Sequence, residues 1–317
     1  MEAQLPTLSI GTAITSTQLF NLLIFTLWRN KEPYILLHIA LAVASLLGGV
    51  SMIMSLPLRY VTHTPVHVFL NLLLVIVLVN YAKCAAILAN VAISVDRWLS
   101  VEFPVRYRTD ITRRKALWAG IVTAFGGALL LDVPGLILFW QNMNFGRCTG
   151  LRTFYGQGVL FTVWEAVKGP IFFPLLFLSQ LRILMIAMRL KLQRHLQRRR
   201  VAKEVLPPGN ASAPTVARIV WSSVWGSMAV VICTLIAHVP NYFLANIPNS
   251  ASAAVRRFAV YLTLVQHCVS PVIYLLFWPL YRKAVMRLLG RVRAVMPLHT
   301  PGWCQPRKNR GSSLIGT

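Results

Sequence analysis

The sequence predicts an all-α membrane protein, in which a bundle of seven transmembrane helices is followed by a short amphipathic eighth helix. Apolar residues make up 56% of the 317 residues and charged residues only 13%, a balance that excludes an ordinary soluble domain. The apolar runs match the roughly 20 residues that a helix needs to cross the hydrocarbon core and exceed the roughly ten-residue strands of a membrane barrel. Because lipid permits only helices or closed barrels, we expect the runs to be helices.

Seven such runs follow one another between polar segments. The expected spans are Leu8–Trp28, Tyr34–Leu56, Val66–Trp98, Lys115–Trp140, Gly158–Leu190, Pro214–Phe243 and Val255–Phe277. No Lys or Arg precedes the first run, which therefore lacks the basic start of a cleaved signal peptide and is expected to act as an uncleaved signal anchor. We find no internal repeat, which disfavours a transporter built from inverted repeats.

The segments outside the seven spans are short. We expect an extracellular N-terminal tail at residues 1–7, a seven-helix domain at 8–278, an amphipathic helix at 279–290 and a disordered cytoplasmic tail at 291–317. The amphipathic helix is predicted because basic and apolar residues are mixed along the run Pro279–Leu289, as in helices that lie on a membrane surface.

The basic residues predict the orientation. With the N-terminus outside, 25 of the 32 Lys and Arg residues fall on the cytoplasmic side, as the positive-inside rule requires. The net charge of +24 is thus mainly a topology signal, with an added attraction to anionic lipids of the inner leaflet. No nucleic-acid partner is expected, because the basic run Lys191–Arg200 directly extends a membrane helix.

The end of the third span carries the most informative motif. Asp96-Arg97-Trp98 stands where the helix meets water, and a loop with Pro104 and several arginines is expected to follow. A charged pair at a helix end is on its own an interfacial anchor. In this context the block resembles the Asp/Glu-Arg-Tyr triplet and second cytoplasmic loop of rhodopsin-like (class A) G-protein-coupled receptors, with Trp98 in place of the tyrosine.

The resemblance extends over nearly the whole chain, because further motifs follow in the same order. Ser45 stands where the second helix of the family has an aspartate, His238 precedes Pro240 where the sixth helix has Trp-x-Pro, and Ser270-Pro271-Val272-Ile273-Tyr274 resembles Asn-Pro-x-x-Tyr of the seventh. The remaining matches are Trp118 and Pro134 in the fourth helix and Pro170 and Pro174 in the fifth. The altered motifs favour an orphan or chemosensory, odorant-like member.

The resemblance implies a ligand-activated receptor at the plasma membrane, which couples to a heterotrimeric G protein when its sixth helix moves outward. It implies that Asp96 holds Arg97 in the resting state and that Tyr274 helps to hold the open form. The residues assigned to coupling and activation are Asp96, Arg97, Trp98, His238, Pro240, Pro271 and Tyr274. A non-coupling scaffold or decoy is the alternative, since Ser45, His238 and Ser270 depart from the family at switch positions, and a transporter is a weaker one.

Other features of such receptors are not expected here. The second outer loop has Cys148, but the only cysteine of the third helix is Cys84, deep in the span, so no disulfide is predicted. Ser45 and Ser270 offer only hydroxyl dipoles to the sodium ion of the family, whereas a hard cation prefers anionic oxygen. No metal or cofactor is expected. The spans show no Ser/His, paired-Asp or His-x-x-x-His arrangement, so an enzyme is not expected either.

Lys83 is the central candidate for ligand binding, because a charge deep in a membrane span is costly and tends to be functional. It lies 14 residues before Arg97, which is about 21 Å along a helix. A small ligand that is anionic or carbonyl-bearing would suit it, and an apolar ligand is the other option. Alternatively, Lys83 pairs internally with Asp132 or Glu165, or snorkels. The candidate pocket residues are Asn80, Lys83, Glu165, His238, Asn241, Tyr242 and His267.

Overall fold

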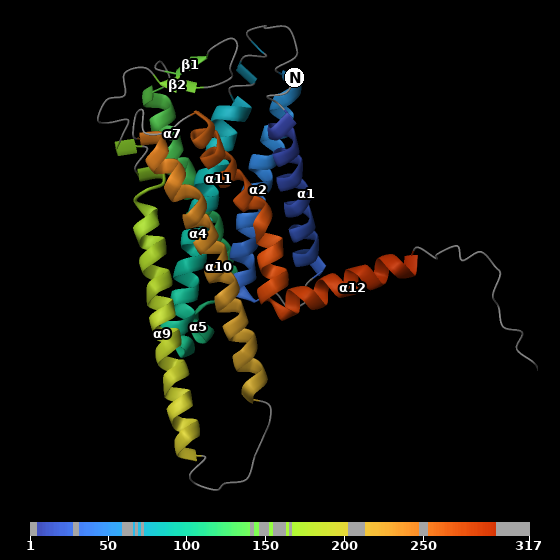
Figure 1. The fold of residues 1–317 in the computed structure, drawn as a ribbon, viewed down its shortest axis with the longest axis vertical. Helices are drawn as coiled ribbons and strands as arrows, with labels where there is room; N and C mark the ends of the chain where they lie inside the picture. Colours follow the sequence, from blue (N-terminus) through green and yellow to red (C-terminus); the bar gives the residue numbers. More distant parts are fainter. Residues whose placement is uncertain are drawn as a thin grey trace, which may run out of the picture.

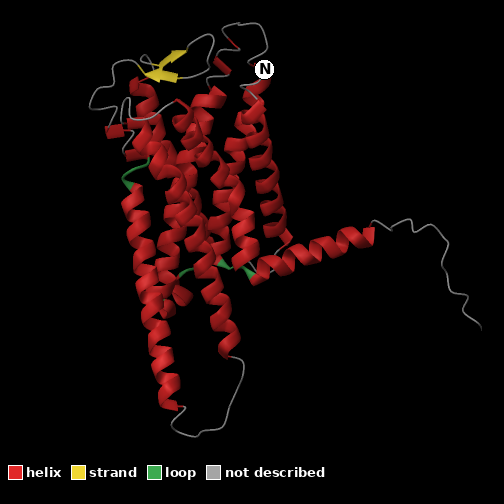
Figure 2. Cartoon of the chain, viewed as in Figure 1, coloured by secondary structure: helices red, strands yellow, loops and turns green. Residues whose placement is uncertain are grey.

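The computed structural model describes residues 5–27, 32–58, 66, 69–70, 73–139, 143–145, 152–154, 163–164, 167–201, 213–246 and 253–295. These residues form an elongated bundle of roughly parallel helices, with a small ribbon of two strands at the end where the N-terminus lies (Figures 1 and 2). The opposite end, at which α9 and α10 extend beyond the other helices, carries the Asp96-Arg97-Trp98 motif and is the inner end of the expected topology.

Six helical stretches among the described residues are long and apolar enough to cross a membrane. They lie in α1 (Leu5–Leu27), α2 (Pro33–Leu58), α4 (Val79–Glu102), the succession of α6 (Arg113–Gly120), η2 (Ile121–Gly126) and α7 (Gly127–Phe139), α10 (Ala213–Asn246) and α11 (Ala253–Phe277). The shorter apolar stretch Phe172–Ile186 begins α9 (Phe172–Val201) and takes the place of the fifth span. The prediction of a multi-pass seven-helix bundle is confirmed.

The expected loop after the third span is helical. A π-helical turn, η1 (Leu73–Leu78), leads into α4, which continues past Trp98 to Glu102. The short helix α5 (Pro104–Asp110) then starts at once, with Pro104 in its first turn, where the missing N–H of proline costs no hydrogen bond. Proline at this position starts a new helix, so the expectation of a loop was wrong.

Two further features lie on the outer side. Residues 169–171 form a turn, which the Phe172 amide closes with a 2.9 Å bond to the Gly169 carbonyl, and α9 begins after it. The described residues 163–164 and 167–168 before this turn are also helical, and the expected start near Gly158 lies outside the described residues. The segment before α9 also contains the strands β1 (Met143–Phe145) and β2 (Arg152–Phe154), which pair antiparallel with Met143 opposite Phe154. Three-residue strands leave too little alternation to be recognised in a sequence.

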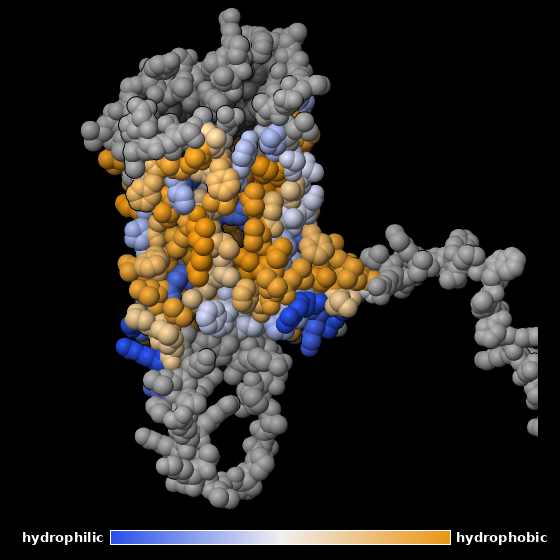
Figure 3. Space-filling view, in the orientation of Figure 1, coloured by the Kyte–Doolittle hydropathy of each residue, from blue (hydrophilic) through white to orange (hydrophobic). Residues whose placement is uncertain are grey.

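The core lies around α4, whose apolar stretch is 61% buried, more than any other span. Its buried face is rich in alanine, and Gly48 of α2 approaches the Ala82 methyl so closely that a Cβ there would be 3.3 Å away. Small residues let membrane helices pack tightly without a hydrophobic driving force between them. Many other large apolar side chains are exposed on the sides of the bundle (Figure 3), the surface that faces lipid in a membrane bundle.

The last helix, α12 (Pro279–Val295), leaves the bundle at a steep angle (Figure 1). Tyr281 is fully buried, Ala284 belongs to the core cluster and Leu288 packs against it, while Arg282, Lys283 and Arg287 are exposed. Figure 3 shows a hydrophilic patch at the base of this helix, beside the bundle. A helix with two such faces occupies the expected place of the eighth helix, and its position on the membrane surface stays a prediction.

Candidate functional site

At the inner end of α4, Arg97 is enclosed by three side chains and is only 5% exposed. Its Nε donates to Asp96 Oδ2 at 3.0 Å and its Nη2 to Tyr107 Oη at 3.3 Å. Tyr107 Oη in turn donates to Asp96 Oδ1 at 2.7 Å. The guanidinium carbon lies 4.4 Å from the centre of the Tyr34 ring, a distance at which a cation and a ring attract each other. Asp96 and Arg97 therefore meet as the motif predicted.

Tyr107 reaches this pair because α5 folds back against the end of α4. Tyr107 is part of α5, three residues after the Pro104 that begins this helix. Burial raises the pKa of Tyr107 above its ordinary value, so the phenol keeps its proton at neutral pH and remains a donor to Asp96. The enclosure of Arg97 thus includes a donor that the predicted loop did not suggest.

Trp98 does not join the enclosure of Arg97. Its Nε1 donates to Glu102 Oε2 at 3.0 Å, and Glu102 also accepts from Arg182 of α9 at 2.9 Å. The indole packs beside the buried cluster of Ile183, Val224 and Met228. The structure therefore places Trp98 at the contact of α4 with α9 and α10, apart from the charged pair with which it was grouped.

Tyr274, near the end of α11, is almost fully buried and bonds to α2. Its hydroxyl lies 2.8 Å from His38 Nδ1, and its ring stacks on Trp278 with 4.4 Å between the ring centres. The His38 and Tyr34 rings meet Trp278 edge-on. These rings form an aromatic cluster, defined here as Tyr34, His38, Tyr274 and Trp278. It lies directly beside Arg97, through Tyr34.

Pro271 leaves a carbonyl of α11 without its helical partner, because proline has no N–H to donate to the residue four positions before it. That residue is His267, and its carbonyl accepts from Gln18 Nε2 of α1. Gln18 and Asn21 both donate to Ser270 Oγ at 3.1 Å. Asn21 also accepts from Tyr281 of α12 at 2.7 Å. A buried polar network thus ties α1 to α11 around Pro271 and ties α12 to α1.

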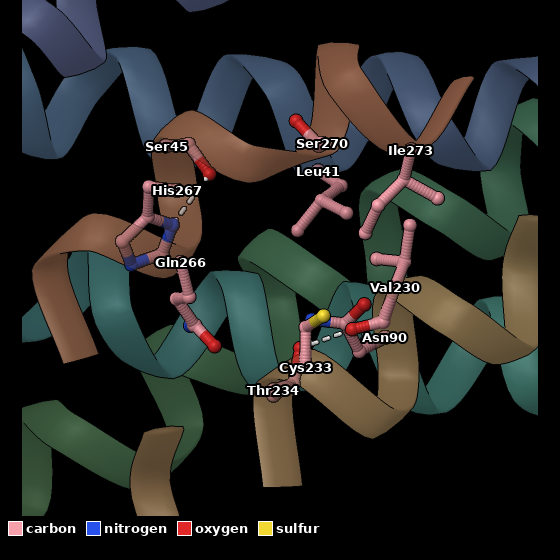
Figure 4. Close-up of a pocket in the computed structure, with 10 residues that line it drawn as sticks. All are labelled: Leu41, Ser45, Asn90, Val230, Cys233, Thr234, Gln266, His267, Ser270 and Ile273. Atoms are coloured by element: carbon pink, nitrogen blue, oxygen red, sulfur yellow. Dashed lines mark hydrogen bonds between the residues drawn. The ribbon is translucent and has the colours of Figure 1, made fainter. Parts of the chain in front are cut away.

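A small cavity, lined by both apolar and polar side chains, lies between α2, α4, α10 and α11 (Figure 4). On one side Ser45 Oγ bonds to His267 Nδ1 at 2.9 Å, and on the other Asn90 Nδ2 donates to Thr234 Oγ1 at 3.2 Å. Within the described part of the chain, the carbonyl oxygens of Asn90 and Gln266 have no hydrogen-bond partner. The cavity, of about 20 Å³, has room for one water molecule.

His238 faces the seventh helix. Its Nε2 lies 2.8 Å from Gln266 Nε2, and its ring is 6.2 Å from that of Phe173 of α9. The ring therefore joins α9, α10 and α11 at the depth of the cavity. Pro240 lies two residues closer to the outer end and is exposed. Asn241 and Tyr242 are half-buried, and the Tyr242 ring lies edge-on to Phe243.

Lys83 lines a second, smaller cavity of about 10 Å³ together with Ser45 and His267. Asn80, almost one turn before it, is half-buried. Asp132, one of the two acids considered as a partner for Lys83, forms an ion pair with Lys168 at 3.5 Å. Lys168 also lies over the Trp164 ring at 3.6 Å. Glu165, the other acid, lies outside the described residues, as does Cys148.

The described residues contain no group of three or more His, Cys, Asp or Glu side chains placed to hold a metal ion. Ser45 and Ser270 stand at the positions compared with the sodium site. The Ser45 hydroxyl bonds to His267, and the Ser270 hydroxyl accepts hydrogen bonds from Gln18 and Asn21. Among the described residues that line the cavity between α2, α4, α10 and α11, none is an aspartate or glutamate. The residues present therefore do not offer the charged ligands that a hard cation prefers.

Sequence reasoning missed several residues of this inner region. They are Gln18, Asn21, Tyr34, His38, Tyr107, Trp278 and Tyr281. All are buried or half-buried, and several are polar groups inside apolar runs, where an uncompensated polar group is costly. That cost could have marked His38, Gln18 and Asn21 as members of a network, although it could not name their partners.

The comparisons with known proteins agree with this geometry. No curated protein matches the chain significantly. The family described as 7 transmembrane receptor (rhodopsin family) matches residues 21–274, which run from Asn21 in α1 through every helix up to Tyr274 in α11. With the seven-helix bundle and the enclosed Asp96–Arg97 pair, this match shows that the chain belongs to the rhodopsin family of seven-transmembrane receptors.

Proposed function

We propose that this receptor couples a small-molecule ligand to heterotrimeric G proteins on its cytoplasmic face through outward movement of α10. One observation carries the proposal. Arg97, the group that matches the G-protein-contacting arginine of the family, is held by Asp96, Tyr107 and Tyr34. This is a closed arrangement from which it can be released.

Release has an electrostatic basis. Separating Arg97 from Asp96 breaks a buried ion pair, which is strongly unfavourable unless new partners are supplied. A G-protein segment entering beside α4 offers backbone carbonyls to the freed guanidinium. The ligand biases this two-state equilibrium only through its difference in affinity for the two states.

The outer half of the bundle supplies the ligand contacts of the proposal. Lys83 offers a positive charge, and His238, His267 and Gln266 offer hydrogen bonds at the same depth. Asn80, Asn241 and Tyr242 are the polar side chains further out. Lys83 favours a ligand with an acidic or carbonyl group, and the apolar walls leave an apolar ligand as the other option.

We place the receptor in the plasma membrane with its N-terminus outside, on the distribution of the basic residues. The exposed Arg282, Lys283 and Arg287 of α12 would then face the anionic lipids of the inner leaflet, with which basic groups at a membrane surface interact favourably.

The test compares guanine-nucleotide exchange by G proteins in membranes carrying the wild-type chain, Arg97→Ala and the control Arg106→Ala. Arg106 is an exposed arginine of α5. At equal surface amount, we expect basal exchange to be lost in Arg97→Ala and kept in Arg106→Ala. Equal exchange from wild type and Arg97→Ala, with a panel of G proteins, contradicts the proposal. Absence of any exchange from the wild type, even with chimeric G proteins and a ligand library, favours the non-coupling decoy, for which Ser45, His238 and Ser270 already argue.

A further inference from the structure

His38 of α2 lies where three helices meet, and both nitrogens of its ring are engaged. Nδ1 lies 2.8 Å from the hydroxyl of Tyr274 on α11, and Nε2 lies 3.3 Å from the hydroxyl of Ser227 on α10. A neutral imidazole has one donor and one acceptor nitrogen, and a hydroxyl can take either role. One histidine therefore links α2, α10 and α11 with full use of its hydrogen-bonding groups.

The imidazole has no freedom to turn away from these partners. It is 0% exposed. Its ring stands edge-on to Trp278, Tyr274 and Tyr34, at interplanar angles of 89°, 88° and 90°. Aromatic pairs favour such edge-to-face contacts. The aromatic cluster thus fixes the orientation in which Nε2 faces Ser227.

The same stretch of α2 also contacts Arg97. Tyr34, one turn before His38, lies against the guanidinium, and both rings pack on Trp278. Tyr34, which contacts Arg97, and His38, which bonds to α10, therefore lie on one face of α2, and both contact Trp278. A movement of α10 that frees Ser227 opens the side of this cluster next to Arg97.

α10 has no acidic side chain along its length. An ion pair between an α10 carboxylate and Arg97 therefore cannot hold α10 in the closed position. Ser227 is almost fully buried, and the neighbouring Gly226 brings the α10 backbone against Trp278. A Cβ at Gly226 would lie 2.2 Å from Trp278 Nε1. The inner half of α10 therefore rests directly on the aromatic cluster.

We propose that His38 is a positioning residue, which holds α10 in its closed position through the hydrogen bond to Ser227 while Tyr274 anchors the ring. The inference rests on the proposed function, in which α10 is the helix that moves. It adds a neutral restraint on α10, made of hydrogen bonds alone, to the ionic contact of the Asp96–Arg97 pair. Losing this restraint shifts the receptor toward the open state without any ligand.

The experiment measures α10 directly. Spin labels are placed at Arg106 of α5 and Arg218 of α10, in a full-length receptor whose other reactive cysteines are replaced, and the distance distribution is recorded by pulsed electron resonance. The variants are His38→Leu, which keeps bulk but removes both hydrogen bonds, His38→Gln, which keeps a donor and an acceptor, and Ser227→Ala. The control is Ser51→Ala, a buried hydroxyl of α2 that bonds to the Leu47 carbonyl of its own helix.

We expect His38→Leu and Ser227→Ala to add a population at longer distance and to raise basal nucleotide exchange by about 5-fold, a typical coupling between two states. His38→Gln and Ser51→Ala should match the wild type, and the double variant should exceed His38→Leu by little. Unchanged distances in both His38→Leu and Ser227→Ala overturn the inference, whatever the signalling. If His38→Leu folds poorly, Ser227→Ala alone decides. Longer distances without any nucleotide exchange uphold the role of His38 and refute the proposed coupling.

Discussion

Replacing Gly226 with alanine should push α10 outward and raise basal signalling. The added methyl would lie 2.2 Å from Trp278 Nε1 and 2.6 Å from Cδ1, whereas ordinary contacts begin at 3.4 Å. One of the two elements must therefore withdraw by about 1.2 Å, a gap that overpacked sites in proteins accommodate only by backbone or side-chain shifts. Either α10 or the Trp278 indole must move.

The packing around Trp278 decides that α10 moves. The indole is 2% exposed, stacks on Tyr274 at an interplanar angle of 19° and meets the His38 ring 4.8 Å away. It is confined by rings from α2 and α11. On the other side, α10 faces lipid with Trp225 and Ile232 exposed, so its displacement meets little resistance.

The magnitude follows from the cost of overpacking, about 1–3 kcal/mol, which falls on the closed state alone. Such a difference shifts the ratio of open to closed receptor by about 5- to 150-fold. Alanine is a better helix former than glycine by roughly 1 kcal/mol, but this gain is equal in the two states. It therefore leaves the ratio unchanged and helps the variant to fold.

The assay is basal nucleotide exchange at matched surface amount, together with the α5–α10 distance measurement. Gly126→Ala is the control, because a Cβ at Gly126 meets nothing within 4 Å. We expect Gly126→Ala to behave like the wild type. Exchange and distance that stay at the wild-type level in Gly226→Ala, at normal surface amount, would refute the reasoning. So would a loss of surface receptor with no outward shift, because Trp278 would then have yielded instead of α10.

Three further predictions concern other contacts. Tyr107→Phe removes the hydroxyl that donates to Asp96 and accepts from Arg97. The closed state then loses about 1–1.5 kcal/mol of hydrogen bonding, which should raise basal nucleotide exchange by about 5- to 10-fold. An unchanged exchange rate contradicts this prediction. Gln18→Leu leaves the His267 carbonyl unpaired at a cost of about 1–3 kcal/mol, so the detergent-solubilised receptor should melt several degrees lower. Thr26→Val, which removes an exposed bond to the Leu23 carbonyl of the same helix, should not lower the melting temperature. Replacing sodium with choline at constant ionic strength should leave melting and signalling unchanged, because Ser45 stands where the family has a carboxylate; sodium-specific stabilisation opposes this.

The charged pair of the inner site was accessible from the sequence, because Asp96 and Arg97 belong to one short motif that the resemblance identifies. Neighbouring positions on a helix do not face each other, so only the structure shows that these two side chains meet. His238 and His267 were assigned to the ligand pocket; both are buried, and their contact with a ligand stays a prediction. Trp98 was assigned to the same group only because it is adjacent, and the structure turns its indole toward Glu102 and Arg182.

The ligand region was less predictable. Asp132, which was weighed as a partner for Lys83, forms an ion pair with Lys168, a contact that the sequence did not indicate because it depends on which helices touch and at what depth. The spacing of residues along α4 gives a depth for Lys83 and no direction around the bundle. The assignment of Lys83 to the ligand therefore stays a prediction.

The sequence by itself determined that this protein is a membrane bundle of helices, because an apolar run of sufficient length must satisfy its backbone hydrogen bonds internally. Only the tertiary structure decided which polar groups meet inside it. His38 bonds to partners 236 and 189 residues away, and Gln18 reaches a carbonyl that Pro271 leaves open 249 residues later. The missing N–H of Pro271 follows from the residue itself and can be read in the sequence. That α1 supplies the replacement donor follows only from packing, which joins segments that lie far apart in the sequence.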